Sequence, residues 1–204
     1  QGIGLAVAKE LSVLGARSFL LARNENMLQQ TISLLSVHEQ QKHEYRVADF
    51  SNNIAVDSAI RSIVDHHNIH ILINNTGGPA AGAVTAATAN DFEDAFRQHL
   101  VNNQLLAQTV LPGMKEEGYG RIINIISTSV KIPIQNLGVS NTIRAAVAAW
   151  AKTLSNEVGQ FNITVNNVLP GSTRTGRLDS LIAEMAEKKQ PGIATIEKEK
   201  KKKI

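Results

Sequence analysis

The sequence predicts an α/β fold built on a doubly wound parallel sheet. Three observations support this class. Short apolar runs rich in branched residues alternate with longer segments of helical period. Clusters of Gly, Pro, Asn and Ser follow several of the apolar runs. The two glycines of Gly2-Ile3-Gly4 come directly before a segment of helical period. Such glycines are expected where a strand ends and a helix begins beside a bound phosphate.

The first third of the chain alternates helix and strand. Ile3, Val7 and Leu11 recur at helical spacing, so the first helix begins near Gly4, and Gly15 separates it from the next element. Each following strand is a short apolar run, and each following helix is a more polar segment. The predicted elements, in order, are helix 4–14, strand 18–22, helix 26–37, strand 45–48, helix 54–66 and strand 69–73.

The second part of the chain continues the alternation with longer helices. We predict a long helix over 89–117, kinked at Pro112 and ended by Gly118 as its C-cap. The next strand, 122–126, is apolar except for Asn124, which is typical of a strand covered on both faces. A helix over 141–158 and a strand over 163–168 follow, and then a polar helix.

Composition narrows the possible functions. The 204 residues suit a single domain, 1–204, and the absence of cysteine excludes disulfides, thiolate metal sites and cysteine nucleophiles. The segment 197–203 holds five lysines and two glutamates, so its net charge of +3 equals that of the whole chain. The rest of the chain has equal numbers of basic and acidic residues, which argues against nucleic-acid binding. No apolar run could span a bilayer, and we expect a cytoplasmic protein.

Five motifs at the ends of predicted strands resemble those of a known family. In order they are Gly2-Ile3-Gly4, Asp49, Asn74-Asn75-Thr76-Gly77, Ser127 and Pro170-Gly171. Together they resemble the short-chain dehydrogenase/reductase family, nearest to its 3-oxoacyl-carrier-protein reductase branch. The resemblance implies a Rossmann-type sheet whose ligands lie at the carboxyl ends of the strands. It also implies a fragment, lacking the first strand and a C-terminal helix and strand, and so a domain incomplete at both ends.

The resemblance also implies a dinucleotide site. The glycine motif would contact the pyrophosphate, although the glycines could instead serve only close helix–strand packing. Arg23 stands where an acidic residue would favour NAD, so we expect NADPH/NADP. Asp49 is either the adenine contact or, with Ser51, a helix N-cap. The implied cofactor-binding residues are Gly2, Ile3, Gly4, Arg23, Asp49, Asn75, Gly77, Arg144, Pro170, Gly171 and Thr175.

The implied catalytic site departs from the family pattern. Ser127 matches the serine that polarises the carbonyl, but Ser140 stands where the family has its tyrosine and Arg144 where it has its lysine. Arginine can bind a ribose but cannot release a proton near neutral pH. His99 occupies a position that is usually asparagine. We hypothesise that it acts as a general acid, the alternative being a histidine that fills a helix contact.

These observations predict an NADPH-dependent oxidoreductase that transfers a hydride between the coenzyme and a small carbonyl or alcohol substrate. The alternative is a catalytically impaired dinucleotide-binding module that acts as a sensor or assembly partner. We expect a homo-oligomer when the protein is complete, with no nucleic-acid or membrane partner. We expect no metal site, because His66, His67 and His70 lack a clear further ligand. Arg174 and Arg177 could attract an anionic substrate or could be solvated loop residues.

Overall fold

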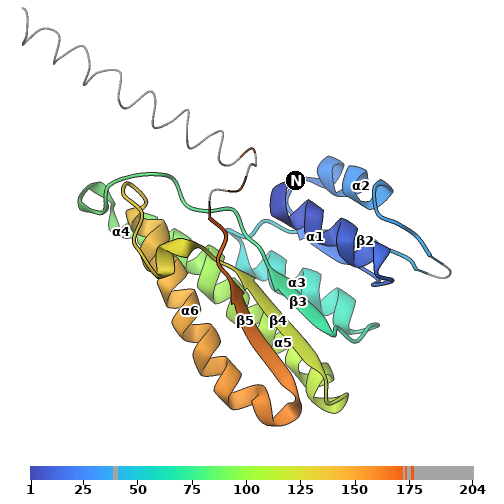
Figure 1. The fold of residues 1–204 in the computed structure, drawn as a ribbon. Helices are drawn as coiled ribbons and strands as arrows, with labels where there is room; N and C mark the ends of the chain where they lie inside the picture. The colour runs from blue at the N-terminus through green and yellow to red at the C-terminus, as the bar shows by residue number, and fades with distance from the viewer. Residues whose placement is uncertain (39–40, 172, 174–175, 177–204) are drawn as a thin grey trace, which may run out of the picture. The chain divides into compact units, whose positions relative to one another are not determined.

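The computed structural model describes residues 1–38, 41–171, 173 and 176. In this part of the chain helices and strands alternate as predicted (Figure 1). The strands are β1 (Phe19–Ala22), β2 (Glu44–Val47), β3 (Ile71–Asn74), β4 (Gly120–Ile125) and β5 (Ile163–Val168). The α-helices are α1 (Gly2–Val13), α2 (Glu25–Ser33), α3 (Asn53–Val64), α4 (Ala89–Phe96), α5 (Asn102–Glu116) and α6 (Gly138–Val158). The polar helix predicted after β5 lies outside the described residues.

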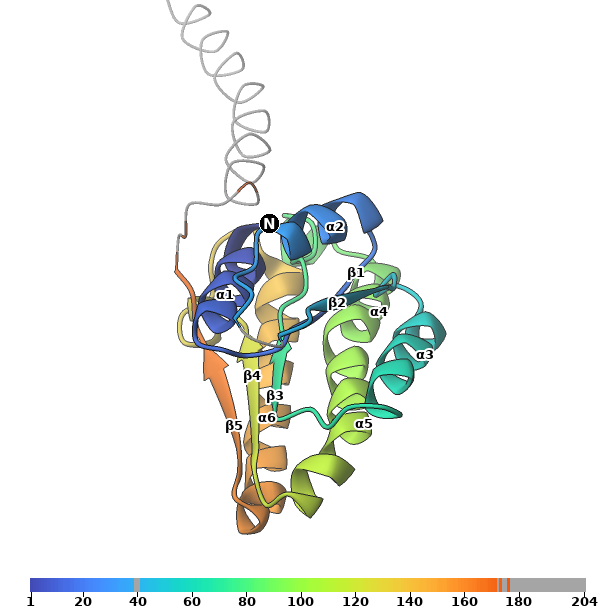
Figure 2. The ribbon, with the colours of Figure 1, turned by 90° about the vertical axis from the view of Figure 1, so that its right-hand side faces the viewer.

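All described strands pair in parallel, and they form two sheets. β1 pairs with β2, while β3, β4 and β5 form a second sheet in that order (Figure 2). Within the described residues, β1 and β3 are each hydrogen-bonded along one edge only. Because every strand runs parallel to its neighbour, the carboxyl ends of β3, β4 and β5 meet at one edge of their sheet.

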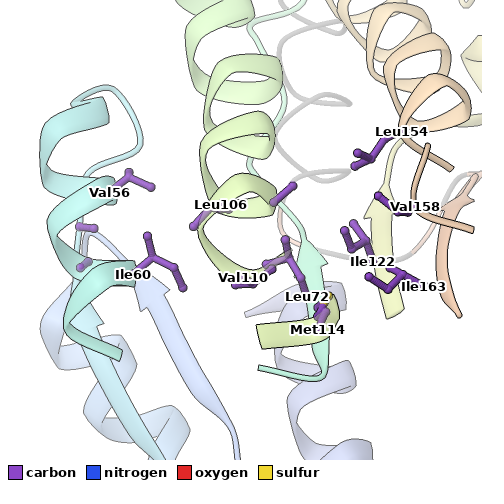
Figure 3. Packing of buried hydrophobic residues seen from close by; sticks show 13 residues of the cluster. Val56, Ile60, Leu72, Leu106, Val110, Met114, Ile122, Leu154, Val158 and Ile163 are labelled. Carbon is purple, nitrogen blue, oxygen red and sulfur yellow. The ribbon is translucent and has the colours of Figure 1, made fainter. Parts of the chain in front are cut away.

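One apolar core holds α3, α5 and α6 against the sheets. Buried side chains from these helices pack on β3, β4 and β5 (Figure 3). The cluster includes Val56, Ile60, Leu72, Leu106, Val110, Met114, Ile122, Leu154, Val158 and Ile163. Their spacing of three, four or seven residues along each helix explains why these segments are helical and which face each one buries.

The predicted helix over 89–117 is wrong as a single element. It is divided into α4, a π-type turn at Arg97–Val101 and α5. A capping box at Thr88 and Asp91 starts α4. α5 continues through Pro112, so the interruption lies well before the proline at which we expected a kink. Gly118 follows α5 with φ of 60°, a left-handed conformation that favours glycine and agrees with the predicted end.

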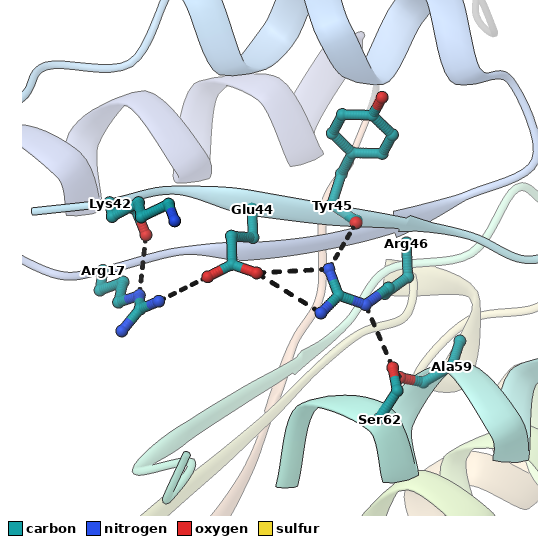
Figure 4. Close-up of polar contacts among 7 residues, drawn as sticks. All are labelled: Arg17, Lys42, Glu44, Tyr45, Arg46, Ala59 and Ser62. Atoms are coloured by element: carbon teal, nitrogen blue, oxygen red, sulfur yellow. Dashed lines mark hydrogen bonds and ion pairs between the residues drawn. The ribbon is translucent and has the colours of Figure 1, made fainter. Parts of the chain in front are cut away.

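A series of hydrogen bonds and ion pairs on the surface connects β2 to neighbouring segments (Figure 4). Glu44 bonds Arg17 at 2.5 Å and Arg46 at 3.4 Å, and Arg46 donates to the Ser62 hydroxyl of α3 at 3.1 Å. The hydrogen bond from Arg17 is the main reason that the pKa of Glu44 lies below its usual value. Since these side chains are partly exposed, the pairs orient the strand more than they stabilise it.

Gly138 begins α6 at a point where two loops meet. The Gly138 N–H donates to the Gly82 carbonyl at 3.1 Å, and a Cβ on Gly138 would lie 2.7 Å from the Val84 backbone nitrogen. We therefore expect Gly138→Ala to lower the free energy of unfolding by about 2 kcal/mol, measured by urea denaturation. Gly82→Ala is the matched control, because a Cβ there meets nothing within 4 Å. Equal stability of the two variants would contradict the prediction.

Candidate functional site

The loops that follow β3, β4 and β5 carry five of the predicted site residues, Asn75, Gly77, Ser127, Pro170 and Gly171. β4 and β5 stay joined beyond their last residues, because the Ile126 N–H donates to the Val168 carbonyl at 2.9 Å and the Thr128 N–H to the Pro170 carbonyl at 3.2 Å. These two bonds bring the loop containing Ser127 beside Pro170. The structure thus brings two of the predicted motifs together at the carboxyl end of the sheet.

The glycine motif lies in the first turn of α1. A Cβ on Gly4 would lie only 2.6 Å from the Asn75 side-chain nitrogen, so a larger residue here would require the Asn75 side chain to move. Ile3 is half-buried, and Gly2 has φ of 56°. Among the described residues, no side chain caps the start of α1. A helix start whose first backbone N–H groups lack a side-chain acceptor favours an anion.

Arg23 follows β1 directly and is exposed. None of the hydrogen bonds or ion pairs found among the described residues involves its guanidinium. Asp49, after β2, accepts hydrogen bonds from the Ser51 N–H and hydroxyl, both at 2.9 Å. These bonds, and to a lesser extent the charge of Arg23, lower the pKa of Asp49. The proposed N-cap role of Asp49 is wrong, because Asn52 caps α3.

Three asparagines form a row across β3, β4 and β5. The Asn74 side-chain nitrogen donates to the Asn124 side-chain oxygen at 2.8 Å, and the Asn124 nitrogen donates to Asn167 at 3.0 Å. The Asn74 side-chain oxygen is buried without a partner among the described residues. From the sequence, Asn124 is visible only as an interruption of an apolar strand, and Asn167 was not predicted, because the partners in the row depend on which strands are neighbours.

Ser127 comes two residues after the buried end of β4 and has an extended conformation. Its hydroxyl oxygen accepts a hydrogen bond from the Ser129 N–H at 3.1 Å. An oxygen held in this way can still direct its own hydrogen to another acceptor. Thr128–Val130, the short helix that Ser127 caps, packs against α6, whose first turn carries the half-buried Ser140.

Arg144 is a buried residue of α6, only 9% exposed. Its guanidinium donates to the Ile125 carbonyl at 2.9 Å and to the Thr76 carbonyl at 3.5 Å. The arginine thus connects the ends of β3 and β4. This anchoring was not foreseen from the sequence, which suggested only a ribose contact.

His99 lies in the π-type turn between α4 and α5 and is 2% exposed. One ring nitrogen, Nδ1, lies 2.5 Å from the Thr76 hydroxyl oxygen. Burial, together with the nearby charge of Arg144, lowers the pKa of His99 to about 3. A neutral imidazole at pH 7 is a poor proton donor, which favours the alternative that this histidine fills a helix contact.

The lowered pKa of His99 makes the fold sensitive to acid. The unfolded state takes up a proton near pH 6.5, whereas the folded state resists protonation down to about 3. The stabilisation is therefore complete above pH 6.5 and is lost as the pH falls through this window. We expect the free energy of unfolding to drop by about 1 kcal/mol more between pH 6 and 5 in the parent than in His99→Gln.

Urea denaturation at the two pH values measures this difference. His38→Gln, which changes an exposed histidine, is the matched control and should behave as the parent does. An identical acid dependence in the parent and in His99→Gln would show that His99 does not carry the effect.

The remaining predicted residues are placed as follows. Asn75, Gly77 and Gly171 are exposed, and Pro170 is half-buried. Thr175, Arg174 and Arg177 lie outside the described residues. Over the described ranges no three metal-ligating side chains gather, and His70 instead pairs with Glu117 at 2.5 Å. No helix in the same ranges is both long and apolar enough to cross a membrane.

Comparisons with known proteins agree with this arrangement. A model of the short chain dehydrogenase family matches residues 1–186. The predicted ketoacyl reductase 1 of the granaticin polyketide synthase of Streptomyces violaceoruber is 33% identical over 178 residues, which cover 86% of this chain and 65% of that protein. The chain thus spans about two thirds of the length of this relative.

Solved structures show the same fold. The NADPH-dependent reductase YwfH, involved in bacilysin biosynthesis, has a TM-score of 0.86 at 26% identity over 92% of this chain and 75% of its own. A variant of the actinorhodin polyketide ketoreductase, solved with NADPH, has a TM-score of 0.82 at 26% identity over 93% of this chain and 73% of its own.

Proposed function

The chain belongs to the short-chain dehydrogenase family, and on that premise we propose that it binds NADPH and transfers a hydride between this coenzyme and a carbonyl or alcohol substrate. The observation that carries the proposal is the meeting of the glycine motif, Asn75, Ser127 and Pro170 at the carboxyl ends of parallel strands. Open α/β sheets bind their ligands at this edge.

The chain's own groups fit a dinucleotide with an additional phosphate. The start of α1, where Gly4 lies against the Asn75 side chain and no side-chain cap is found among the described residues, is where a pyrophosphate would bind. Arg23 would bind the 2′-phosphate, because its exposed guanidinium has no competing partner among the described residues. Asp49 and Gly77 would contact the adenosine, and Pro170, Gly171 and Thr175 would adjoin the nicotinamide.

When bound, NADPH would supply the hydride. The Ser127 hydroxyl would donate a hydrogen bond to the substrate oxygen and so stabilise the negative charge that develops there. Its position suits this role, since its oxygen is already held by the Ser129 N–H. Arg144, whose guanidinium lies at the ends of β3 and β4, would contact the ribose, and Ser140, one turn earlier, would adjoin the substrate.

A second candidate is a module that binds the coenzyme with little or no turnover. It is favoured by the lack of an effective proton donor. The Ser140 hydroxyl is a much weaker acid than a phenol, whose pKa is about 10. Arg144 is anchored on backbone carbonyls, and His99 is neutral. Such a module would sense the coenzyme or assemble with a partner.

Three wider expectations remain proposals. We propose that in the complete protein a further parallel strand lies between β1 and β3, which agrees with their unpaired edges. We also propose that a further helix and strand extend the sheet beyond β5. We propose that the single domain 1–204 pairs with a second copy. We propose a cytoplasmic location and a small-molecule carbonyl substrate.

The test is NADPH consumption, followed by absorbance, with a panel of ketones and 3-oxoacyl thioesters. We expect carbonyl-dependent oxidation that Ser127→Ala slows strongly. Thr128→Ala is the matched control, because it changes the exposed neighbour and keeps the backbone bond to Pro170. A protein that binds NADPH but reduces no carbonyl would leave only the second candidate.

A further inference from the structure

The asparagine row occupies one register position of the three-stranded sheet. Asn74 is the partner of Asn124 in the β3–β4 ladder, and Asn124 is the partner of Asn167 in the β4–β5 ladder. Side chains two residues apart in a strand share a face. The row therefore lies on the face of Leu72 and Ile122, which the core helices cover (Figure 3).

The row is largely shielded from water. Asn124 is 0% exposed, Asn74 is 5% exposed, and Asn167 is half-buried. A buried side-chain amide has lost its hydrogen bonds to water. Each hydrogen bond that it makes inside the protein therefore constrains the position of that side chain. Asn124 uses its oxygen toward Asn74 and its nitrogen toward Asn167. The central amide thus fixes both neighbouring strands against β4.

The predicted site residues follow this row closely. Thr76 comes two residues after Asn74, Ser127 three residues after Asn124, and Pro170 three residues after Asn167. The row is separated from these loops by the last strand residues, and two backbone bonds continue the pairing there, from Ile126 to Val168 at the end of β5 and from Thr128 to Pro170 in the loop after it. A shift of one strand against another at the row would carry the loops with it.

We propose that Asn124 and Asn167 are positioning residues of the dinucleotide site. They hold the ends of β3, β4 and β5 at fixed relative positions, so that the loops containing Thr76, Ser127 and Pro170 present one preformed surface to the coenzyme. Preformed sites bind more tightly because little ordering remains to be done on binding. This role rests on the proposed function, since it concerns the same site.

Variants of Asn167 test the role. Asn167→Ala removes the acceptor of Asn124, whereas Asn167→Asp keeps an oxygen in its place and should rescue the parent behaviour. Asn166→Ala is the matched control, because Asn166 is the exposed neighbour and its side chain donates to the Thr164 hydroxyl of its own strand. NADPH affinity, followed by coenzyme fluorescence, and hydrogen exchange of the Ile126 and Thr128 amides are measured for each.

We expect Asn167→Ala to weaken NADPH binding about tenfold and to speed exchange of both amides about tenfold. Asn167→Asp and Asn166→Ala should match the parent within about twofold. A purely structural role would lower thermal stability without changing NADPH affinity in the folded protein, and this result would overturn the proposal.

The exchange readout separates this proposal from the proposed function. If the parent binds no NADPH, the proposed function and the coenzyme-site role of the row both fail. If the parent binds and Asn167→Ala binds and exchanges as the parent does, only the positioning role fails.

Discussion

Replacing Arg23 by glutamate is expected to weaken NADPH binding about 100-fold and to leave NADH binding unchanged or improved. The change removes a guanidinium beside the expected 2′-phosphate and adds a negative charge. A 100-fold loss corresponds to about 2.7 kcal/mol, the range of a lost charge-assisted contact with added repulsion. Because the ribose of NADH has a hydroxyl at this position, glutamate can accept its hydrogen bond instead.

Titration calorimetry with both coenzymes measures this switch. Arg97→Glu is the matched control, since it makes the same charge reversal at another exposed arginine and should change neither affinity by more than about twofold. Equal weakening of NADPH and NADH by Arg23→Glu would show that the arginine does not read the phosphate.

The double variant Ser140→Tyr, Arg144→Lys is expected to raise the rate of carbonyl reduction about 100-fold or more. A positioned general acid contributes about 10² to 10⁴ in rate, and a phenol with a pKa near 10 is far more acidic than a serine hydroxyl. The lysine keeps the positive charge one helical turn away, where it would lower the pKa of the phenol. It would also release the Ile125 and Thr76 carbonyls that Arg144 now binds.

Single-turnover rates of the parent, the double variant and both single variants measure the effect. Ser140→Phe, Arg144→Lys is the matched control, because it adds the ring without the hydroxyl. A parent that binds NADPH without turnover, beside an active double variant, would establish the second candidate function. A double variant no faster than the control would contradict the assignment of Ser140 to the proton-donor position.

Most of the fold was predictable because each element has a local signal. The last strand was predicted with the bounds that the structure gives it, since its apolar run ends sharply at Pro170 and Gly171. The interruption at Arg97–Val101 was not predictable, because one widened turn leaves the apolar spacing on either side unchanged. The neighbours of each strand within the two sheets depend on long-range pairing, which no local pattern encodes.

The candidate site was predictable where it depends on chain order. Parallel strands bring their following loops to one edge, so Ser127 and Pro170 could be placed together without coordinates. The roles of buried polar groups required the structure. Only the contacts show that Arg144 binds two backbone carbonyls and that burial keeps His99 neutral.

The central claim is that the strand ends form a site for NADPH, and calorimetric titration of the purified protein tests it most directly. We predict a single site that binds NADPH at least about tenfold more tightly than NADH, as the charge of Arg23 requires. The absence of binding heat with both coenzymes, from a protein shown to be folded, would contradict the account.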